Sequence, residues 1–356
     1  MAMVIDNHVH LISGTPGNEY LPPKYRWWAC YGWAYGYPQS PPYDRDPADL
    51  YERQEQRVAD PDGTATVKAM DAAGVDACVL IHADFGLAYG ELGPKSMEEM
   101  HQDHVNIAKK HPGRFYPFAG PDVRRPGSLE MVRRGIGDGS FKGLKVFPEV
   151  GYFVNDPALY PFYSTCLEAE VPVAICTNFE PPMARPRMND PLYITDVVAD
   201  FPDLPVIIFH AGYPFEHWFN ICLSIARAAL NVSITIEPWL WGYPGWGKGG
   251  EEDGIRKIAK IRDAIGAHRI HFGTDGQFAN TNWGEGRIKV YQDQVNIWRE
   301  LPERAKRFGI SFSQEEVDLM MGLNLGRLLG AVDMPEYKKA RKYGWSILMP
   351  RPMPTP

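Results

Sequence analysis

The chain has 356 residues, of which 44% are hydrophobic and 12% aromatic, so it can bury a large core. Its formal net charge is -7 with both signs interspersed, which argues against nucleic acid as a partner. No apolar run approaches the ~18 residues of a membrane span, the first residues lack a signal-peptide pattern, and the five cysteines form no CxxC pair. We therefore expect a cytoplasmic protein with reduced cysteines and no membrane partner.

Short apolar runs alternate along the chain with longer amphipathic runs. The apolar runs predict strands at Met3–Asn7, Ala77–His82, Phe115–Ala119, Gly143–Phe147, Val171–Cys176, Val206–His210, Val232–Glu237 and Ile270–Thr274. The amphipathic runs predict helices at Thr64–Ala73, Ser96–His111, Ser128–Gly135, Pro157–Glu168, Pro191–Asp200, Glu216–Ala229, Glu252–Ile265, Lys289–Arg307 and Gln314–Leu329. Eight strands alternating with helices indicate an α/β fold, the (β/α)8 TIM barrel. The alternative, an open doubly wound sheet, usually carries a GxGxxG loop, which this sequence lacks.

A long segment, Ser13–Gly63, separates the first predicted strand from the first helix and is rich in Pro, Gly, Tyr and Trp. In a barrel it leaves from the C-terminal face, where active sites lie, so we predict a lid, a subunit contact or a packing arm across the mouth. We expect one barrel domain over residues 1–330 and a Pro-rich tail over 331–356. Because aromatic residues are enriched at interfaces, we also expect a homo- or hetero-oligomer.

The leading functional signal is a pair of histidines, His8 and His10, after the first apolar run. Side chains two apart in a strand share a face, so both imidazoles can bind one metal ion, and imidazole is the commonest metal ligand. His210 ends the run VIIFH, where it can bind metal or polarise a substrate, and Asp275 follows the eighth strand. Asp275 can hold the ion and accept a proton from metal-bound water. The structural alternatives are hydrogen-bonded imidazoles and an Asx-turn before Gly276.

Two further candidate ligands are Lys145 and Glu237, both in predicted strands. A lysine that points into a barrel is costly to bury as a cation, so Lys145 either pairs with a carboxylate such as Glu149 or reacts with CO2 to form a carbamate. Glu237 offers a hard oxygen ligand or the partner of a nearby cation. His82 fits a core and a site equally well. We expect the other histidines to be solvated on a helix (His101, His104 and His111) or structural (His217, His268 and His271).

Five segments together resemble the amidohydrolase-related family, in the branch of aminocarboxymuconate semialdehyde and resorcylate decarboxylases. These are IDNHVH, GLKVFPEVGY, PDLPVIIFHAGYP, FGTDG and GLNLGRLLG, in this order over almost the whole barrel. The resemblance implies a metal-dependent (β/α)8 barrel. It also implies that His8, His10, His210 and Asp275 are the metal and catalytic residues.

The sequence departs from this family after the fifth strand, where the pattern PVxxH is replaced by PVAIC and Cys176 stands in place of a ligand. Lys145 falls where binuclear members of the wider superfamily carry a carboxylated lysine. We therefore expect one or two divalent ions (Zn, Mn or Fe), with Lys145 and Glu237 completing the ligand set. The first functional hypothesis is hydrolysis or decarboxylation of a small organic substrate. The second is O2-dependent hydroxylation at a dinuclear Fe or Mn site, and the third is a non-catalytic partner subunit.

Overall fold

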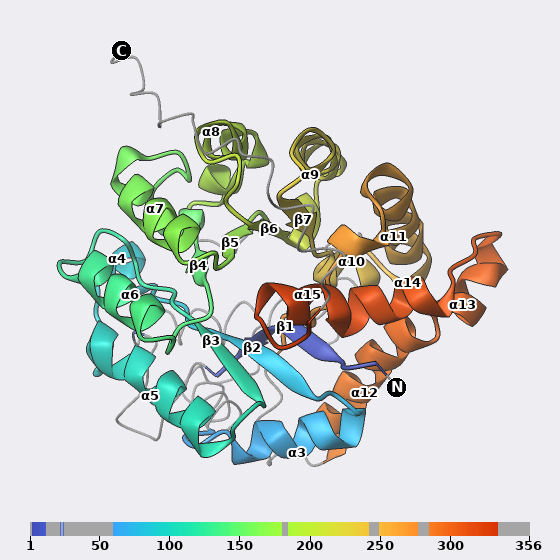
Figure 1. The fold of residues 1–356 in the computed structure, drawn as a ribbon, viewed down its shortest axis with the longest axis horizontal. Coiled ribbons are helices and arrows are strands. Elements are labelled where there is room, and N and C mark those ends of the chain that lie inside the picture. Colours follow the sequence, from blue (N-terminus) through green and yellow to red (C-terminus); the bar gives the residue numbers. More distant parts are fainter. Residues whose placement is uncertain are drawn as a thin grey trace, which may run out of the picture.

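The computed structural model describes residues 2–11, 22, 24, 60–179, 184–241, 249–276 and 285–333. The strands are β1 (Ile5–His10), β2 (Ala77–Ile81), β3 (Phe115–Phe118), β4 (Leu144–Val146), β5 (Val173–Cys176), β6 (Val206–Phe209) and β7 (Val232–Ile234). The α-helices are α3 (Thr64–Ala73), α4 (Gly86–Tyr89), α5 (Met97–Lys110), α6 (Ser128–Gly137), α7 (Tyr160–Glu168), α8 (Ile194–Asp200), α9 (Glu216–Ala228), α10 (Glu237–Trp241), α11 (Glu251–Ile265), α12 (Glu285–Arg299), α13 (Leu301–Arg304), α14 (Gln314–Asp318) and α15 (Asn324–Leu328). Figure 1 shows the strands at the centre, surrounded by the longer helices.

The strands are parallel and lie in two sheets, ordered β1-β2-β3 and β4-β5-β6-β7. Single parallel bridges join these sheets to each other and to the segment around residues 270–276. The bridges are Ala119–Leu144, Ile234–Ile270 and Val9–Gly276. Eight parallel segments thus follow one another around a ring, which agrees with the predicted TIM barrel. The predicted eighth strand, Ile270–Thr274, takes part only through these bridges.

The apolar runs became strands because both of their faces are covered. The sequences ACVLI in β2 and VIIF in β6 are buried at every position, as expected of parallel strands under helices. The helix α5 begins at a capping box, in which Ser96 and Glu99 satisfy each other's backbone amides. Acidic residues lie in its first turn and basic residues in its last, in favourable alignment with the helix dipole.

Two differences from the sequence-based prediction concern the site, and a third lies at the opposite end of the ring. The first strand runs from Ile5 to His10 rather than over Met3–Asn7, so both histidines lie within it. Glu237 begins the short helix α10 instead of ending a strand. The predicted helix Gln314–Leu329 is interrupted by a π-helical turn at Leu319–Leu323. Apolar content predicted these elements, but the register of the ring sets where each one stops.

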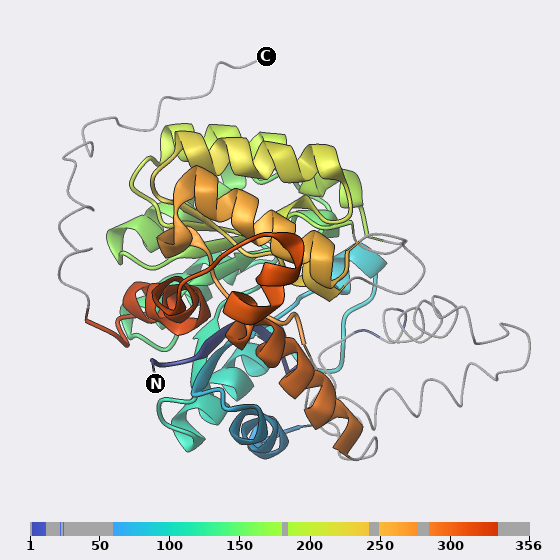
Figure 2. The same cartoon turned by 90° about the vertical axis from the view of Figure 1, so that its right-hand side faces the viewer.

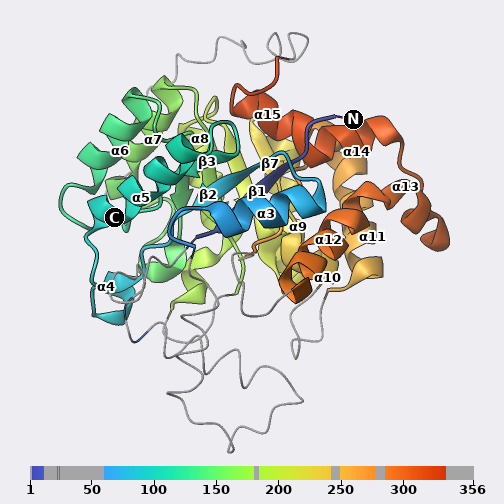
Figure 3. The ribbon, with the colours of Figure 1, turned by 90° about the horizontal axis from the view of Figure 1, so that it is seen from below.

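The helices α14 and α15, with the π-helical turn between them, cover the end of the ring where β1 begins. A Cβ atom added to Gly322 in that turn would lie 1.8 Å from the carbonyl oxygen of Met3, so helix and strand are in close contact there. Figure 2 shows these red helices beside the blue start of β1. Figure 3 shows α3 between α5 and α12 on one side of the ring. The opposite end, where the strands finish, carries the candidate site.

Most of the Ser13–Gly63 insertion and most of the 331–356 tail lie outside the described residues. The predicted lid or subunit contact, the domain limits and the oligomer therefore stay predictions. Among the helices of the described ranges, none combines the length and apolar character that crossing a membrane requires.

Candidate metal centre

The first strand brings two imidazoles to the inside of the ring through an irregular register. Its pairing with β2 slips between Asp6 and Val9, where three residue steps in β1 span two steps in β2. Without this bulge, Asp6 would share the inner face with His8 and His10, because side chains alternate along a strand. With it, Asp6 turns toward α12 while both imidazoles stay inside. The two histidines thus share a face, as predicted, and the bulge, which the sequence did not indicate, removes Asp6 from that face.

Three donor atoms converge at the end of β1. The Nε2 atoms of His8 and His10 are 2.9 Å apart, and Asp275 Oδ1 lies 3.3 Å from each of them. The Nδ1 atom of His10 is 3.1 Å from the carbonyl oxygen of Ile81, to which it donates as the protonated nitrogen. That hydrogen bond leaves the Nε2 lone pair of His10 facing the other donors. The ends of β1 and of the 270–276 segment therefore meet at one point.

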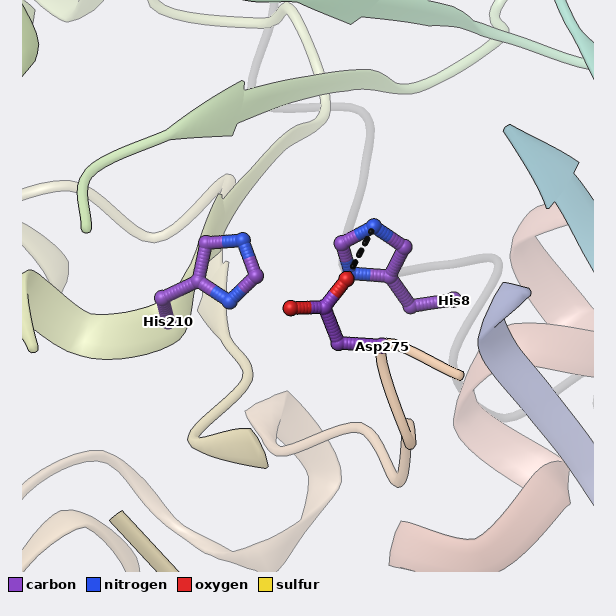
Figure 4. A group of neighbouring side chains, drawn as sticks. All are labelled: His8, His210 and Asp275. Atoms are coloured by element: carbon purple, nitrogen blue, oxygen red, sulfur yellow. Dashed lines mark ion pairs between the residues drawn. The ribbon is translucent and has the colours of Figure 1, made fainter. Parts of the chain in front are cut away.

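A carboxylate and a third imidazole extend the group toward β6 and β7. Glu237 Oε1 lies 3.7 Å from His8 Nδ1, and its Oε2 lies 3.4 Å from His210 Nδ1. The Thr235 hydroxyl donates to Glu237 Oε2 at 2.6 Å and fixes the carboxylate. One donor atom each from His8, His210 and Asp275 falls within 4.8 Å of the others. Figure 4 shows the Asp275 carboxylate between the two imidazoles, with one oxygen toward each.

The backbone at this site is strained at three residues that are not glycine. His210, Ala211 and Asp275 have φ values of 70°, 44° and 53°, in the left-handed region. Each such conformation costs on the order of 1–3 kcal/mol and persists only where surrounding contacts impose it. Two of the three are candidate ligands, so the strain aims these side chains into the ring rather than along it.

Burial and neighbouring charges put the donors in the protonation states that metal binding requires. Burial lowers the pKa of His8 well below its ordinary value, and the charge of Lys145 lowers it further, although Asp275 opposes the shift. Burial raises the pKa of Asp275, but the imidazoles beside it outweigh this and hold it well below its usual range. Burial also opposes ionisation of Glu237, and His210 and Thr235 more than offset it. Neutral imidazole beside carboxylate is the ligand form.

These residues fit a divalent cation. The buried atoms His8 Nδ1, His210 Nδ1 and Glu237 Oε1 have no hydrogen-bond partner among the described residues. Metal–ligand bonds of about 2.0–2.2 Å place neighbouring donors roughly 3–3.5 Å apart, which the triangle of His8, His10 and Asp275 matches. Buried polar atoms left without partners are costly, and a cation bound between them would satisfy them. Mixed imidazole and carboxylate donors suit Zn, Mn or Fe.

Lys145 is buried close to this group but does not make the predicted pair with Glu149. Its side chain is 1% exposed, and Nζ has no hydrogen-bond partner among the described residues. Nζ lies 3.8 Å from the ring centre of Phe209 and 5.0 Å from that of Phe147. The Phe209 ring in turn packs against His8 at 4.7 Å. Ring faces attract a cation and repel an anion, so these contacts favour an amino group over a carbamate.

The residue in the family's ligand position after β5 is a buried thiol. Cys176 is in register with Phe209 of the neighbouring strand β6 and is 1% exposed. Its Sγ donates to the side-chain oxygen of Asn178 at 2.8 Å. Cys176 is thus the last residue of β5, and its thiol is directed at the Asn178 side chain. Within the described residues, the candidate ligand group that can be assembled does not include it.

The expectation of a solvated histidine-bearing helix at α5 is wrong for two of its three histidines. His101 and His104 are 2% and 1% exposed, and their rings pack against His82 at 4.4 and 5.5 Å. His101 Nδ1 donates to the Met97 carbonyl at 2.7 Å, and its Nε2 accepts from the Gly120 amide at 3.0 Å. Because α5 packs against the barrel along this edge, histidine serves as a hydrogen-bonded core residue. His82 belongs to this cluster.

Asp6 is a site-supporting residue that the sequence analysis missed. Its Oδ1 accepts hydrogen bonds from the backbone amides of His8 and Thr274, each at 3.0 Å. Its Oδ2 accepts from the hydroxyls of Thr274 at 2.6 Å and Tyr291 at 3.0 Å. This fully buried carboxyl therefore ties the bulge of β1 to the residue before Asp275. The available signal was an acidic residue inside an apolar run next to the histidine pair.

Burial raises the pKa of Asp6 to about 7 against the hydrogen bonds that it accepts. A raised pKa means that the folded state holds the proton more tightly, so stability falls as pH rises from 3.8 to about 7.

The Asp6→Asn variant has no titrating proton at this position. Its side-chain oxygen can still accept from the backbone amides of His8 and Thr274. We expect its unfolding free energy, measured by denaturant titration with chelator present, to lack this decline. Asp6→Ala should instead lose about 2–5 kcal/mol at every pH, because two buried amides lose their acceptor. Parallel pH dependence in wild type and Asp6→Asn would contradict this account.

Gly273 gives Glu237 the space that it occupies. A Cβ atom at position 273 would lie 2.7 Å from Glu237 Oε1. We expect Gly273→Ala to displace the carboxylate, to weaken metal binding and to destabilise the fold by about 1–3 kcal/mol. Gly137→Ala is the matched control, because a Cβ there meets nothing within 4 Å. Metal affinity measured by competition with a chelator checks the result, and equal affinities in the two variants would count against it.

The comparison with known families decides the class of this protein. The sequence profile described as Amidohydrolase matches residues 5–331 of the chain. The chain belongs to the amidohydrolase family. The amidohydrolase is therefore an enzyme of a metal-dependent superfamily, as its motifs indicated. The match favours an enzyme over the non-catalytic subunit, and the comparisons give the dinuclear oxygenase no support.

Solved structures similar to this amidohydrolase share its barrel. An uncharacterized TIM-barrel protein from Bordetella bronchiseptica is 19% identical with a TM-score of 0.59, over 92% of this chain and 99% of that one. A 2,6-dihydroxybenzoate decarboxylase from Rhizobium is 17% identical with a TM-score of 0.56, over 93% and 99%. A 5-carboxyvanillate decarboxylase from Novosphingobium aromaticivorans, complexed with manganese, is 15% identical with a TM-score of 0.59, over 92% and 96%. At these identities the likeness shows the fold. The search of curated proteins found no match.

Proposed function

We propose that this amidohydrolase removes the carboxyl group of a small aromatic acid, with a divalent ion held by His8, His10 and Asp275. The observation that carries the proposal is the meeting of these three donors within 3.3 Å of one another inside the ring. His210 and Glu237 are proposed as the remaining metal or substrate contacts. Two of the barrels with a similar fold are decarboxylases of hydroxylated benzoates, which supports the choice of substrate class.

The proposed reaction needs an electron sink and a proton. A bound ion would supply Lewis-acid polarisation of a substrate oxygen. When the bond between ring and carboxyl carbon breaks, CO2 leaves and the electron pair stays on the ring carbon, which must then take a proton. In this proposal Asp275, a carboxylate at rest, takes a proton from water and passes it to the ring carbon through its second oxygen, which faces His210 (Figure 4). Glu237, fixed by Thr235, orients the His210 imidazole for contact with the substrate.

Lys145 is proposed to act through charge. Its charge lowers the pKa of His8, so it keeps that imidazole in the neutral form that binds metal. Carboxylation of Lys145 stays the alternative, in which case the lysine would be a metal ligand itself. A dependence of activity on added bicarbonate would favour the carbamate, and independence would favour the charge role.

Metal content gives the direct test. We expect about one equivalent of Mn or Zn in the purified enzyme, and a loss of about two orders of magnitude in metal affinity in His8→Ala. His217→Ala is the control. Because His217 is exposed on α9, this variant should retain the metal. CO2 release from hydroxylated benzoates by metal-loaded enzyme then tests the reaction. Full metal content in His8→Ala would refute the proposed ligand set, and cleavage of an amide or ester instead of CO2 release would replace decarboxylation by hydrolysis.

A further inference from the structure

A pocket of about 440 Å³ opens beside the loops that follow β5 and β6, at the end of the ring that carries the metal centre. This volume lies in the range of small-molecule sites, roughly 300–1,000 Å³. Three aromatic residues, two arginines and one proline line it, and most of the lining surface is apolar. The lining residues are Phe179, Arg185, Pro186, Arg187, Phe215 and Trp218.

The aromatic side of this rim pocket is rigidly coupled to the loop that carries His210. The rings of Phe179 and Phe215 meet edge to face at 5.6 Å, and those of Phe215 and Trp218 at 5.1 Å. The side chain and backbone of Trp218 pack against Gly212, where an added Cβ would lie 2.5 Å from Trp218 Cβ. Gly212 is two residues from His210, and its φ of 72° suits glycine. A ligand held by these rings is therefore held in a fixed relation to the His210 turn.

The arginine side of the rim pocket is anchored to β4 and β5. The Arg185 amide donates to the Glu149 carbonyl at 2.7 Å, just after β4. The Asn189 side chain donates to the Asn178 carbonyl at 2.8 Å, just after β5. These bonds fix both ends of the segment that contains the two arginines.

Arg185 and Arg187, the two arginines of the rim pocket, are exposed. The arginines at 124 and 125 pair with Asp122 and Asp84. By contrast, no carboxylate in the described part of the chain forms an ion pair with Arg185 or Arg187. Guanidinium groups bind carboxylates through paired, charge-assisted hydrogen bonds, and aromatic rings stack on or edge against a planar ring. Together they match a small planar aromatic anion.

We infer that the rim pocket is a recognition subsite for a planar aromatic carboxylate, with Arg185 and Arg187 on the anion and Phe215 and Trp218 on the ring. The inference rests on the proposed function, because it assigns the pocket to an aromatic acid on its way to the metal centre. The same chemistry would suit an aromatic anion that binds here as an effector, and the kinetic part of the experiment separates the two.

The test measures benzoate binding by titration calorimetry, with the full-length enzyme in metal-loaded and chelator-treated forms. Chelator-treated protein excludes binding of the carboxylate to the metal. We expect Arg185→Ala/Arg187→Ala to weaken benzoate binding by about tenfold or more in both forms. Arg133→Ala is the matched control, because Arg133 is likewise exposed, on α6, and should stay within about twofold of wild type. Benzyl alcohol, which lacks the charge, and cyclohexanecarboxylate, whose ring is neither aromatic nor planar, should both bind more weakly than benzoate.

Steady-state kinetics decide whether the bound anion is a substrate or an effector. A rise of about tenfold in KM at constant kcat in the double arginine variant would support a substrate subsite. Unchanged KM together with lost benzoate binding would overturn the substrate assignment and indicate an effector site. Equal benzoate binding in wild type and the double variant would overturn the subsite itself. If no variant releases CO2 from any aromatic acid, the proposed function fails, while the binding result with chelator-treated protein still decides whether the pocket binds aromatic anions.

Discussion

Asp275→Asn should lower kcat/KM by about three orders of magnitude, which corresponds to roughly 4 kcal/mol of transition-state stabilisation. The Asp275 carboxylate faces His8 and His10 at 3.3 Å and turns its other oxygen toward His210. An amide at this position carries no charge for the metal and no basic oxygen for the proton. The loss should therefore appear in both metal affinity and the chemical step.

The fold should survive this substitution. Asp275 has a φ of 53°, a conformation that asparagine tolerates better than most residues. Circular dichroism and the melting temperature should thus stay close to those of wild type. Asp263→Asn is the control, because that carboxylate is exposed on α11 and pairs with Arg262. If metal-loaded Asp275→Asn kept full activity, Asp275 would have no catalytic role and the proposed mechanism would fall.

Lys145→Met should stabilise the protein and impair its activity. The amino group of Lys145 is buried without a hydrogen-bond partner among the described residues, and its neighbours are phenylalanine rings. Burying a polar group in this way is unfavourable, so an apolar side chain of similar length should raise the unfolding free energy by about 1–3 kcal/mol. A denaturant titration of the chelator-treated protein measures this gain.

The activity loss in Lys145→Met should depend on pH with a definite sign. The charge of Lys145 lowers the pKa of His8, so its removal lets that pKa rise. More of the imidazole is then protonated on the acid side, where it cannot bind metal. The acid limb of the kcat/KM profile should therefore move to higher pH.

Lys257→Met provides the matched control for the stability effect. Lys257 is also buried, but its Nζ pairs with Glu216 at 2.7 Å and Asp253 at 2.6 Å. Removing it leaves these carboxylates without their cation, so Lys257→Met should be less stable than wild type. A destabilised Lys145→Met would show that Lys145 is paired in solution and would remove the reason for its proposed role.

The parts of the fold that depend on local pattern were accessible from the sequence. The runs ACVLI and VIIF had to be buried on both faces, and the alternation of such runs with amphipathic segments predicted the barrel. The donors His8, His10, His210 and Asp275 were found because each follows or ends such a run, and parallel strands finish at the same end of a barrel. The structure brings all four together at that end.

Other features depend on contacts between segments far apart in the chain. Whether the α5 histidines face solvent or barrel is decided by the neighbours of that helix, so the sequence predicts solvent exposure for His101 and His104, which the structure buries. The sequence leaves Lys145 two alternatives, an ion pair with a carboxylate such as Glu149 or a carbamate, whereas the structure points its Nζ at the Phe209 ring.

The sequence by itself determined the fold class and the identity of the converging donors, because side-chain alternation and apolar burial are properties of short segments. Only the tertiary structure decided the geometry of the centre. The bulge in β1, the carboxyl of Asp6 that locks it, and the contact of Glu237 with two imidazoles all arise where residues distant in sequence meet. Such meetings follow from ring closure and packing, which no single segment encodes.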